Sequence, residues 1–316
     1  MQRVESPLFL VGAVRSGTTL LGLMLEHHPE IAFPGEFELV VELRGPNGEF
    51  PDLGEYYDWL RVNRHFSGHH LEIDQTLGFR DLADDLLVQM RRSSRGPARP
   101  HLGVSVHRHF TRLVQLWPGA RYIHLLRDPR DVSVSMMEQG WAGNPYTGAR
   151  QWREIEEEWD RALPSIPAGR RIEVRFEELT ADPHATLERI CAFVGVSYSE
   201  RMLSYPEDTT YGPLDPHVAE RWRQAFTPCA VRLAEAGASD MLERRGYAPS
   251  GPRWRPGRAT EALLETHCRL SRLRFRLRRY GVGLWLRRQL ATALGLEAWR
   301  RRIQLEEHEI TNRYLK

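Results

Sequence analysis

Short apolar runs alternate with amphipathic segments along the first three quarters of the chain. Four runs have the length and composition of buried strands, at residues 8–12 (LFLVG), 103–106 (GVSV), 121–126 (RYIHLL) and 172–176 (IEVRF). Helical patterns are found at residues 18–28, 110–116, 131–138, 183–194 and 230–244. This alternation predicts an α/β fold in which helices cover both faces of a parallel sheet. Sheets of this kind bind ligands at the C-terminal ends of their strands.

The pattern changes at Pro249. Residues 249–258 (PSGPRWRPGR) have the composition of a linker or loop. Residues 260–310 are expected to be helical, and they are rich in arginine and poor in glycine. We therefore predict a main domain over residues 1–248 and a helical C-terminal extension over residues 249–316.

Composition and charge restrict the class of protein. The net charge of +2 is too small to indicate nucleic-acid binding. Lys316 is the only lysine among the 44 basic residues, so a cation at a buried anion site must be arginine or protonated histidine. The three cysteines lie far apart, which predicts neither a disulfide framework nor a zinc site. The chain shows no signal-peptide pattern and no apolar run of about 20 residues, so we expect a cytoplasmic protein.

The turn after the first strand carries candidate chemistry. Residues 12–19 (GAVRSGTT) have the spacing of a phosphate-binding loop, GxxxxGK[ST], and lie between a strand and a helix, where that loop belongs. Its glycines allow backbone N–H groups to turn toward an oxyanion, and the helix N-terminus adds partial positive charge. We expect a phosphate to be bound here by Arg15, Ser16, Gly17, Thr18 and Thr19.

One position departs from this motif, because Thr18 stands where the motif has lysine. Nucleoside triphosphatases use that lysine on the β- and γ-phosphates. The absence of this lysine favours binding of a terminal phosphate over binding of a polyphosphate. Arg15 would then supply the positive charge. We find no acidic strand end suited to magnesium and expect no metal ion. A P-loop nucleotide kinase or other phosphotransferase is the alternative function, and a glycine turn without a ligand is the simplest interpretation.

Two segments of the chain resemble parts of a known enzyme family. The segment FLVGAVRSGTTLLGLMLEHHPEIAFPGE resembles the 5′-phosphosulfate-binding region of sulfotransferases that use 3′-phosphoadenosine 5′-phosphosulfate (PAPS), and looks closest to the tyrosylprotein and bacterial branches. RYIHLLRDPRDVSVSM is similar to the family's 3′-phosphate-binding region, which implies that Arg127 and Ser135 hold that phosphate. Weaker similarity at ERWRQAF implies that Arg221 approaches the nucleotide. The resemblance covers roughly residues 7–247.

The resemblance implies a P-loop-type parallel sheet and a specific reaction. A sulfuryl group would move from PAPS to an acceptor hydroxyl by in-line displacement, releasing adenosine 3′,5′-bisphosphate (PAP). Arg15 is then the candidate for stabilising the leaving 5′-phosphate. The resemblance allows a small molecule, a glycan or a tyrosine as the acceptor that carries this hydroxyl. The segment from Arg127 to Asp131 also has the pattern of a capped helix start, with Pro129 near the first turn.

Two residues are candidates for the base that accepts the hydroxyl proton. Glu36 lies 21 residues after Arg15, the spacing of the catalytic glutamate in tyrosylprotein sulfotransferases. His107 follows the GVSV strand, where the cytosolic branch has K-T-H with a catalytic histidine. Ser105 stands in place of that lysine, and Arg108 is a candidate source of the missing charge. A surface glutamate and a strand-end histidine are the simpler interpretations.

The C-terminal extension has two interpretations. Its arginines interleave with apolar residues between positions 269 and 290. The helices can pack an apolar stripe on the main domain or on a second copy of the chain, or they can present a basic amphipathic surface to an anionic membrane or an acidic substrate. We expect acceptor-binding loops at residues 40–67 and 144–150, together with these helices.

Overall fold

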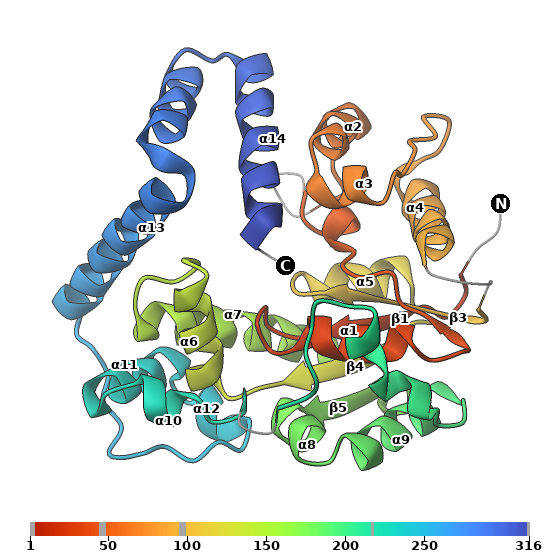
Figure 1. Ribbon diagram of the computed structural model, residues 1–316. Helices are drawn as coiled ribbons and strands as arrows, with labels where there is room; N and C mark the ends of the chain where they lie inside the picture. Colours follow the sequence, from red (N-terminus) through yellow and green to blue (C-terminus); the bar gives the residue numbers. More distant parts are fainter. Residues whose placement is uncertain (1–3, 44–48, 95–98, 216–217, 315–316) are drawn as a thin grey trace.

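A five-stranded parallel sheet forms the centre of the computed structural model, which describes residues 4–43, 49–94, 99–215 and 218–314. Helices lie on both faces of this sheet (Figure 1). The strand order is β2-β3-β1-β4-β5, with β1 (Leu8–Val11), β2 (Ile31–Ala32), β3 (His101–Val106), β4 (Arg121–Leu126) and β5 (Arg171–Arg175). The predicted α/β fold with a P-loop-type parallel sheet is confirmed.

The middle strand β1 is buried on both faces. Phe9 and Val11 belong to one apolar cluster, which includes residues of α4 (Phe79–Ser93) and α5 (Phe110–Leu116). Leu8 and Leu10 point into a second cluster, which includes residues of α1 (Thr18–Glu26) and α9 (Pro183–Val194). Successive residues of a strand face opposite sides of the sheet, so four consecutive apolar residues are required here.

The strand register brings three chain segments to one edge of the sheet. Val11 of β1 pairs with Val106 of β3 and with His124 of β4. Residues 12–17, His107 and Arg127 therefore leave neighbouring strands at the same C-terminal edge. Two helices begin close to this edge, α6 (Pro129–Glu138) and α8 (Phe176–Ala181).

The four strands expected from the sequence are confirmed within two residues at each end, but several other elements differ. Strand β2 was not expected from the sequence, because its two residues are too few to form a recognisable apolar run. Residues 40–67 and 144–150 are not the open loops that we expected: the first contains α2 (Leu53–Arg61) and α3 (Arg64–Gly68), and α7 (Pro145–Ala162) begins in the second. Asp52, Asn63 and Asn144 accept hydrogen bonds from the first backbone N–H groups of these helices.

The helix expected at residues 230–244 is two helices, α11 (Pro228–Ala238) and α12 (Met241–Arg244). They are separated at Ser239, whose φ of 55° lies outside the helical region. A four-residue helix, α10 (Trp222–Ala225), precedes them. None of the helices within the described residues combines the length and the apolarity that a membrane span requires.

The C-terminal extension is a helical hairpin of α13 (Arg258–Ala293) and α14 (Glu297–Tyr314) (Figure 1). Gly281 has a positive φ of 81° with ψ 156°, which is non-helical and kinks α13. Leu284, Ala291 and Ile303 form a small apolar core between the two helices.

Both helices of the hairpin contact the main domain. Near the start of α13, Asn144 Nδ2 donates to the carbonyl of Leu264 at 2.8 Å, and Tyr146 Oη donates to Glu261 at 3.0 Å. On α14, Arg301 lies 3.4 Å from Asp58 of α2. The expected packing on the main domain is therefore found, while the domain boundary at residue 248 stays a prediction.

Candidate active site

The loop after β1 requires glycine at two positions. Gly12 has φ 152°, and a Cβ there would lie 2.4 Å from the carbonyl oxygen of Leu125. Gly17 has φ 98°, and a Cβ there would lie 2.3 Å from the ring of Phe176. Real Cβ contacts are never this close, so both residues allow the loop to pack directly against β4 and α8. The loop then delivers Thr18 as the first residue of α1.

A cavity of about 330 Å³ opens at this edge of the sheet. Nine of the residues singled out from the sequence line it: Arg15, Gly17, Thr18, Thr19, Glu36, His107, Arg127, Ser135 and Arg221. Among the residues expected to bind the phosphate, Ser16 does not line the cavity, because it is fully buried. Below, this cavity is called the nucleotide pocket.

Arg15 is held between α6 and an aromatic ring. Its Nε donates to Ser135 Oγ at 2.9 Å, and its guanidinium lies 5.5 Å from the centroid of the Trp141 ring. Arg15 itself has φ 71°, within the left-handed region. Residues 120 positions apart in the chain thus meet in one polar contact.

Arg127 is a buried cation at the end of β4. It is only 6% exposed, and its guanidinium stacks 4.2 Å from the centroid of the Phe176 ring. It donates to the carbonyls of Arg15 at 3.3 Å and Val218 at 2.8 Å. Burial lowers the pKa of Arg127, and the charge of Asp131 raises it. Arg127 therefore connects the phosphate-binding loop with the segment around Val218.

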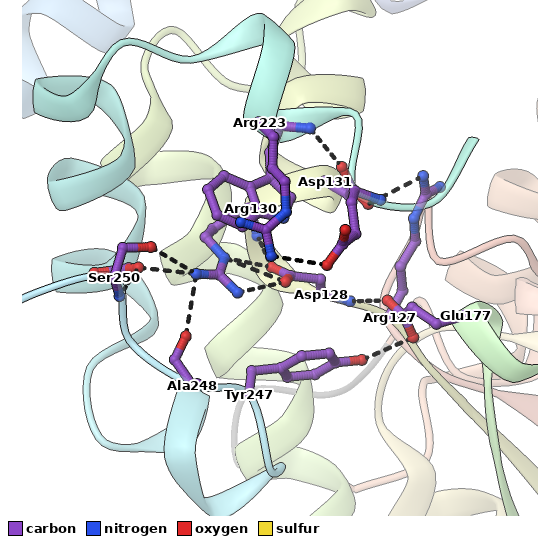
Figure 2. Close-up of polar contacts among 12 residues, drawn as sticks. Arg127, Asp128, Arg130, Asp131, Glu177, Arg223, Tyr247, Ala248 and Ser250 are labelled. Atoms are coloured by element: carbon purple, nitrogen blue, oxygen red, sulfur yellow. Dashed lines mark hydrogen bonds and ion pairs between the residues drawn. The ribbon is translucent and has the colours of Figure 1, made fainter. Parts of the chain in front are cut away.

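The start of α6 is a dense polar network (Figure 2). Asp128 caps the helix by accepting from the backbone N–H of Arg130 at 2.8 Å, and it also binds the Arg130 guanidinium. Glu177 of α8 accepts from the backbone N–H of Asp128 at 2.9 Å and from Tyr247 Oη at 3.2 Å. The capped helix start expected from the sequence is confirmed. Arg127, the residue before the cap, lines the nucleotide pocket at the same time.

Asp131 orients the segment that carries Arg221. Its carboxylate accepts from the backbone N–H groups of Glu220 and Trp222, both at 2.8 Å. Arg221 lies between these two residues, lines the nucleotide pocket and forms an ion pair with Glu138 at 2.8 Å. The position of Arg221 at the pocket thus depends on a buried carboxylate of α6.

His107 is part of a buried chain of three side chains. Its Nδ1 lies 2.8 Å from Glu38 Oε1, and the same oxygen accepts from the backbone N–H of His107 at 2.7 Å. On the other side of the ring, Nε2 lies 3.0 Å from Thr18 Oγ1. Glu38 is 6% exposed and His107 is 4% exposed. A carboxylate only accepts hydrogen bonds, so Nδ1 carries a proton.

The pair of Glu38 and His107 favours its charged form. Burial by itself lowers the pKa of His107, but the hydrogen bond and charge of Glu38 raise it above its ordinary value. Burial by itself raises the pKa of Glu38, but His107 and Arg108 bring it below its ordinary value. With both ring nitrogens protonated, Nε2–H donates to Thr18 Oγ1. His107 then supplies a cation beside the loop position where the lysine of other P-loops is missing.

We expect the stability contributed by this pair to depend on pH. Because the pKa of His107 is raised in the folded state, its contribution is complete below the unfolded value of 6.5 and is lost as the pH rises through the folded value. The loss of unfolding free energy in His107→Gln, measured by urea denaturation, should therefore be larger near about pH 6 than near about pH 9.

The exposed His184 provides the control for this measurement, since His184→Gln should change stability little at either pH. An equal loss of stability in His107→Gln at both pH values would show that the ring is neutral in the folded protein.

Glu36 lies at the border of the nucleotide pocket. Gly35 and Phe37 hydrogen-bond to the backbone of Ser105, at 2.9 and 2.8 Å, which extends the sheet pairing beyond β2. The side chain of Glu36 is 38% exposed, and its Oε2 lies 3.3 Å from His65 Nε2. Glu36 therefore has a fixed backbone and a carboxylate open to the pocket.

Ser105 and Arg108, which we expected to compensate for the missing family lysine, do not line the pocket in the structure. Ser105 is buried in β3 and is not among the described residues that line the pocket. Arg108 is also absent from that lining and instead lies 3.6 Å from Glu38 Oε2. His107, which we proposed only as a base, is the candidate for the positive charge that the missing lysine would supply.

Several buried polar atoms at or near the pocket have no hydrogen-bond partner within the described residues. They include Ser16 Oγ, Arg127 Nε and Tyr205 Oη. Buried polar groups normally find a partner, and Arg127 lines the pocket, so its free donor fits an anionic ligand. No group of three or more metal-ligating side chains occurs within the described residues.

Three contributors to the site were missed in the sequence. Glu38 lies two residues after Glu36 but is buried, because the 3-10 turn at Glu38–Val40 aims its side chain inward. Phe176 contacts both Gly17 and Arg127, which only the three-dimensional pairing of β5 beside β4 reveals. Asp131 had a helix-start signal but no signal for its contact with the segment at 220–222.

Comparison with known proteins agrees with this geometry. Residues 7–200 match the family described as "Sulfotransferase family". Protein-tyrosine sulfotransferase 2 of Gallus gallus is 24% identical over 287 residues, covering 78% of this chain and 70% of that protein. Protein-tyrosine sulfotransferase 1 of Danio rerio is 21% identical over 298 residues, covering 85% of this chain and 80% of that protein.

Solved structures show the same fold. The sulfotransferase domain from the Synechococcus PCC 7002 olefin synthase aligns with a TM-score of 0.56 at 23% identity, covering 76% of this chain and 99% of that domain. The sulfotransferase domain from the curacin biosynthetic pathway aligns with a TM-score of 0.54 at 18% identity, covering 78% of this chain and 99% of that domain.

Proposed function

This chain belongs to the sulfotransferase family and is a PAPS-dependent sulfotransferase, and we propose that it uses the nucleotide pocket to transfer a sulfuryl group to an acceptor hydroxyl. One observation carries the proposal. The residues of the two phosphate signatures, more than 100 positions apart in the chain, line a single cavity at the C-terminal edge of the sheet.

The two phosphates of the nucleotide have separate sets of partners in this proposal. The 5′-phosphosulfate lies on the loop, where backbone N–H groups, Thr18 and Thr19 hold it and Arg15 stabilises the charge of the leaving phosphate. The 3′-phosphate is bound by Arg127 and Ser135, and Arg221 closes the pocket beside them. The unpartnered Nε of Arg127 supports this assignment.

Glu36 is the proposed base. The acceptor oxygen attacks sulfur while the bond from sulfur to the 5′-phosphate oxygen breaks, and the bonding electrons leave on PAP. The acceptor proton passes to the Glu36 carboxylate. His107 is poorly suited to take this proton, because Nδ1–H donates to Glu38 and Nε2 contacts Thr18. We assign His107 to holding Thr18 and to adding positive charge near the leaving phosphate.

A comparison of donors tests the proposed reaction. The protein is incubated with [³⁵S]PAPS or with [γ-³²P]ATP and Mg²⁺, each with a panel of phenols, sugars and tyrosine peptides. We expect transfer of label from PAPS alone. Transfer of phosphate from ATP would instead support the nucleotide kinase that the loop spacing first allowed.

The names of the curated relatives bear on the acceptor. Their protein-tyrosine sulfotransferase designations support keeping a phenolic hydroxyl among the acceptors to be tested, beside small molecules and glycans. A cytoplasmic location, contact of the C-terminal helices with an anionic membrane surface, and a homodimer stay predictions.

A further inference from the structure

A second cavity, of about 410 Å³, adjoins the nucleotide pocket. Its walls come from α13, α14, α2, α3 and the end of α6. We call it the arginine cavity, and the described residues that line it are Glu42, Trp59, Asn63, Arg64, His65, Gln139, Gly140, Trp141, Arg272, Phe275, Arg276, Arg279, Tyr280, Gln304, His308 and Thr311. The C-terminal hairpin thus forms about half of a cavity whose other half belongs to the main domain.

The two cavities meet at the proposed reaction centre. Trp141 lines both of them, and its ring lies beneath the guanidinium of Arg15. Glu36 lines the nucleotide pocket, and its carboxylate contacts His65, which lines the arginine cavity. The arginine cavity therefore borders the surroundings of Arg15 and Glu36.

The charge of the arginine cavity is strongly unbalanced. Four arginines line it, at positions 64, 272, 276 and 279, against the single carboxylate of Glu42. Arg272 and Arg276 form no ion pair with the side chains that the structure describes. Further along the hairpin, by contrast, Arg287 and Arg288 pair with Glu306 and Glu307 at 2.9 and 2.5 Å.

Contacts between the helices fix the segments that carry these arginines, while the side chains of Arg272 and Arg276 themselves are exposed. Tyr280 and Thr311 hydrogen-bond at 3.0 Å across α13 and α14, and both line the cavity. Gln304 of α14 donates to the carbonyl of Val62 at 3.4 Å, between α2 and α3. The cavity is therefore walled on several sides and has a volume typical of small-molecule sites.

We infer that the arginine cavity binds the acceptor, and that the acceptor is a small molecule carrying an anionic group, a carboxylate or a phosphate, in addition to its reactive hydroxyl. This inference rests on the proposed function. Arg272 and Arg276 bind the anionic group, while the hydroxyl lies near Glu36. Charged hydrogen bonds between guanidinium and carboxylate or phosphate provide the selectivity.

Binding to the PAP-saturated protein tests this inference. Two matched pairs are titrated by calorimetry: 4-hydroxyphenylacetate against its neutral amide, and glucose 6-phosphate against glucose. We expect an anionic member to bind at least about tenfold more tightly than its neutral partner. The two pairs distinguish a carboxylate acceptor from a phosphate acceptor.

The helix itself offers a matched control. Arg272→Ala/Arg276→Ala should reduce the preference to below about threefold, whereas Arg272→Lys/Arg276→Lys should retain part of it because the charge is kept. Arg274→Ala/Arg278→Ala removes the same charge at the same spacing from the far side of α13, and neither residue is among the described lining. This variant should keep the full preference for the anionic probe. The affinity for PAP should be unchanged in all three double variants.

Two results would overturn the inference. One is the absence of any preference for the anion in both pairs, including the case in which no probe binds. The other is an equal loss of preference in the two alanine variants, which would indicate a general effect of charge. Failure of the wild-type protein to bind PAP in the first titration would instead contradict the proposed function.

Discussion

Glu36→Gln is expected to lower the turnover of PAPS by about 10²- to 10⁴-fold, the usual contribution of a general base. Glutamine keeps the size of the side chain but cannot accept the proton of the acceptor hydroxyl. The backbone around Glu36 is held by Ser105, so the substitution should leave the loop and the pocket intact. The affinity for PAP, measured by calorimetry, should therefore change little while kcat falls.

His107→Gln separates the two candidate bases. Because His107 contacts Thr18, we expect this variant to weaken PAP binding as well as to slow turnover. Glu178→Gln, on the exposed part of α8, serves as the control for loss of a carboxylate. Near-normal turnover in Glu36→Gln, together with an inactive His107→Gln that still binds PAP normally, would assign the base to His107.

Arg127→Ala is expected to weaken the binding of PAP by about ten- to hundredfold. The loss of charge-assisted hydrogen bonds to the 3′-phosphate is worth about 1.5–3 kcal/mol. Adenosine 5′-phosphosulfate has no 3′-phosphate, so its affinity should fall much less. The measured quantity is the ratio of the two dissociation constants, by calorimetry, in wild type and variant.

The ratio is needed because Arg127 also donates to the carbonyl of Arg15 and stacks on Phe176. Loss of these contacts would disturb the loop and lower the affinity for both nucleotides to the same extent. Arg189→Ala, on the exposed surface of α9, provides a control for the removal of one positive charge. Equal losses for the two nucleotides in Arg127→Ala would mean that Arg127 supports the loop and does not read the 3′-phosphate.

The parts of the site that lie next to a strand end were predictable from the sequence. The loop at Gly12 to Thr19 and the Arg127 segment each follow an apolar run, and the parallel sheet brings their strand ends to one edge. The spacing of glycines and the Pro129 helix start are local signals. Local chemistry and strand order therefore sufficed to find the loop, whereas the assignment of Arg127 and Ser135 to a 3′-phosphate came from the family resemblance.

The parts that depend on tertiary contacts were not predictable. Glu38 and Glu36 are two residues apart and chemically alike, yet one is buried against His107 and the other faces the pocket. The amphipathic α2 and α3 were read as loops, although Asp52 and Asn63 cap them. Acceptor binding was expected at residues 40–67 together with the C-terminal helices, but the arginine cavity itself was not predicted. Half of its wall comes from residues 42–65 and 139–141, which lie far from α13 and α14 in the chain.

In the proposed function, the nucleotide pocket recognises a nucleotide with a 3′-phosphate and no polyphosphate. Calorimetric titration of the wild-type protein with PAP, and separately with ATP and Mg²⁺, tests this recognition directly. We predict that PAP binds one site without added metal, at least about tenfold more tightly than ATP with Mg²⁺. Tighter binding of ATP with Mg²⁺, or a PAP affinity that requires the metal, would contradict recognition of the 3′-phosphate by this pocket.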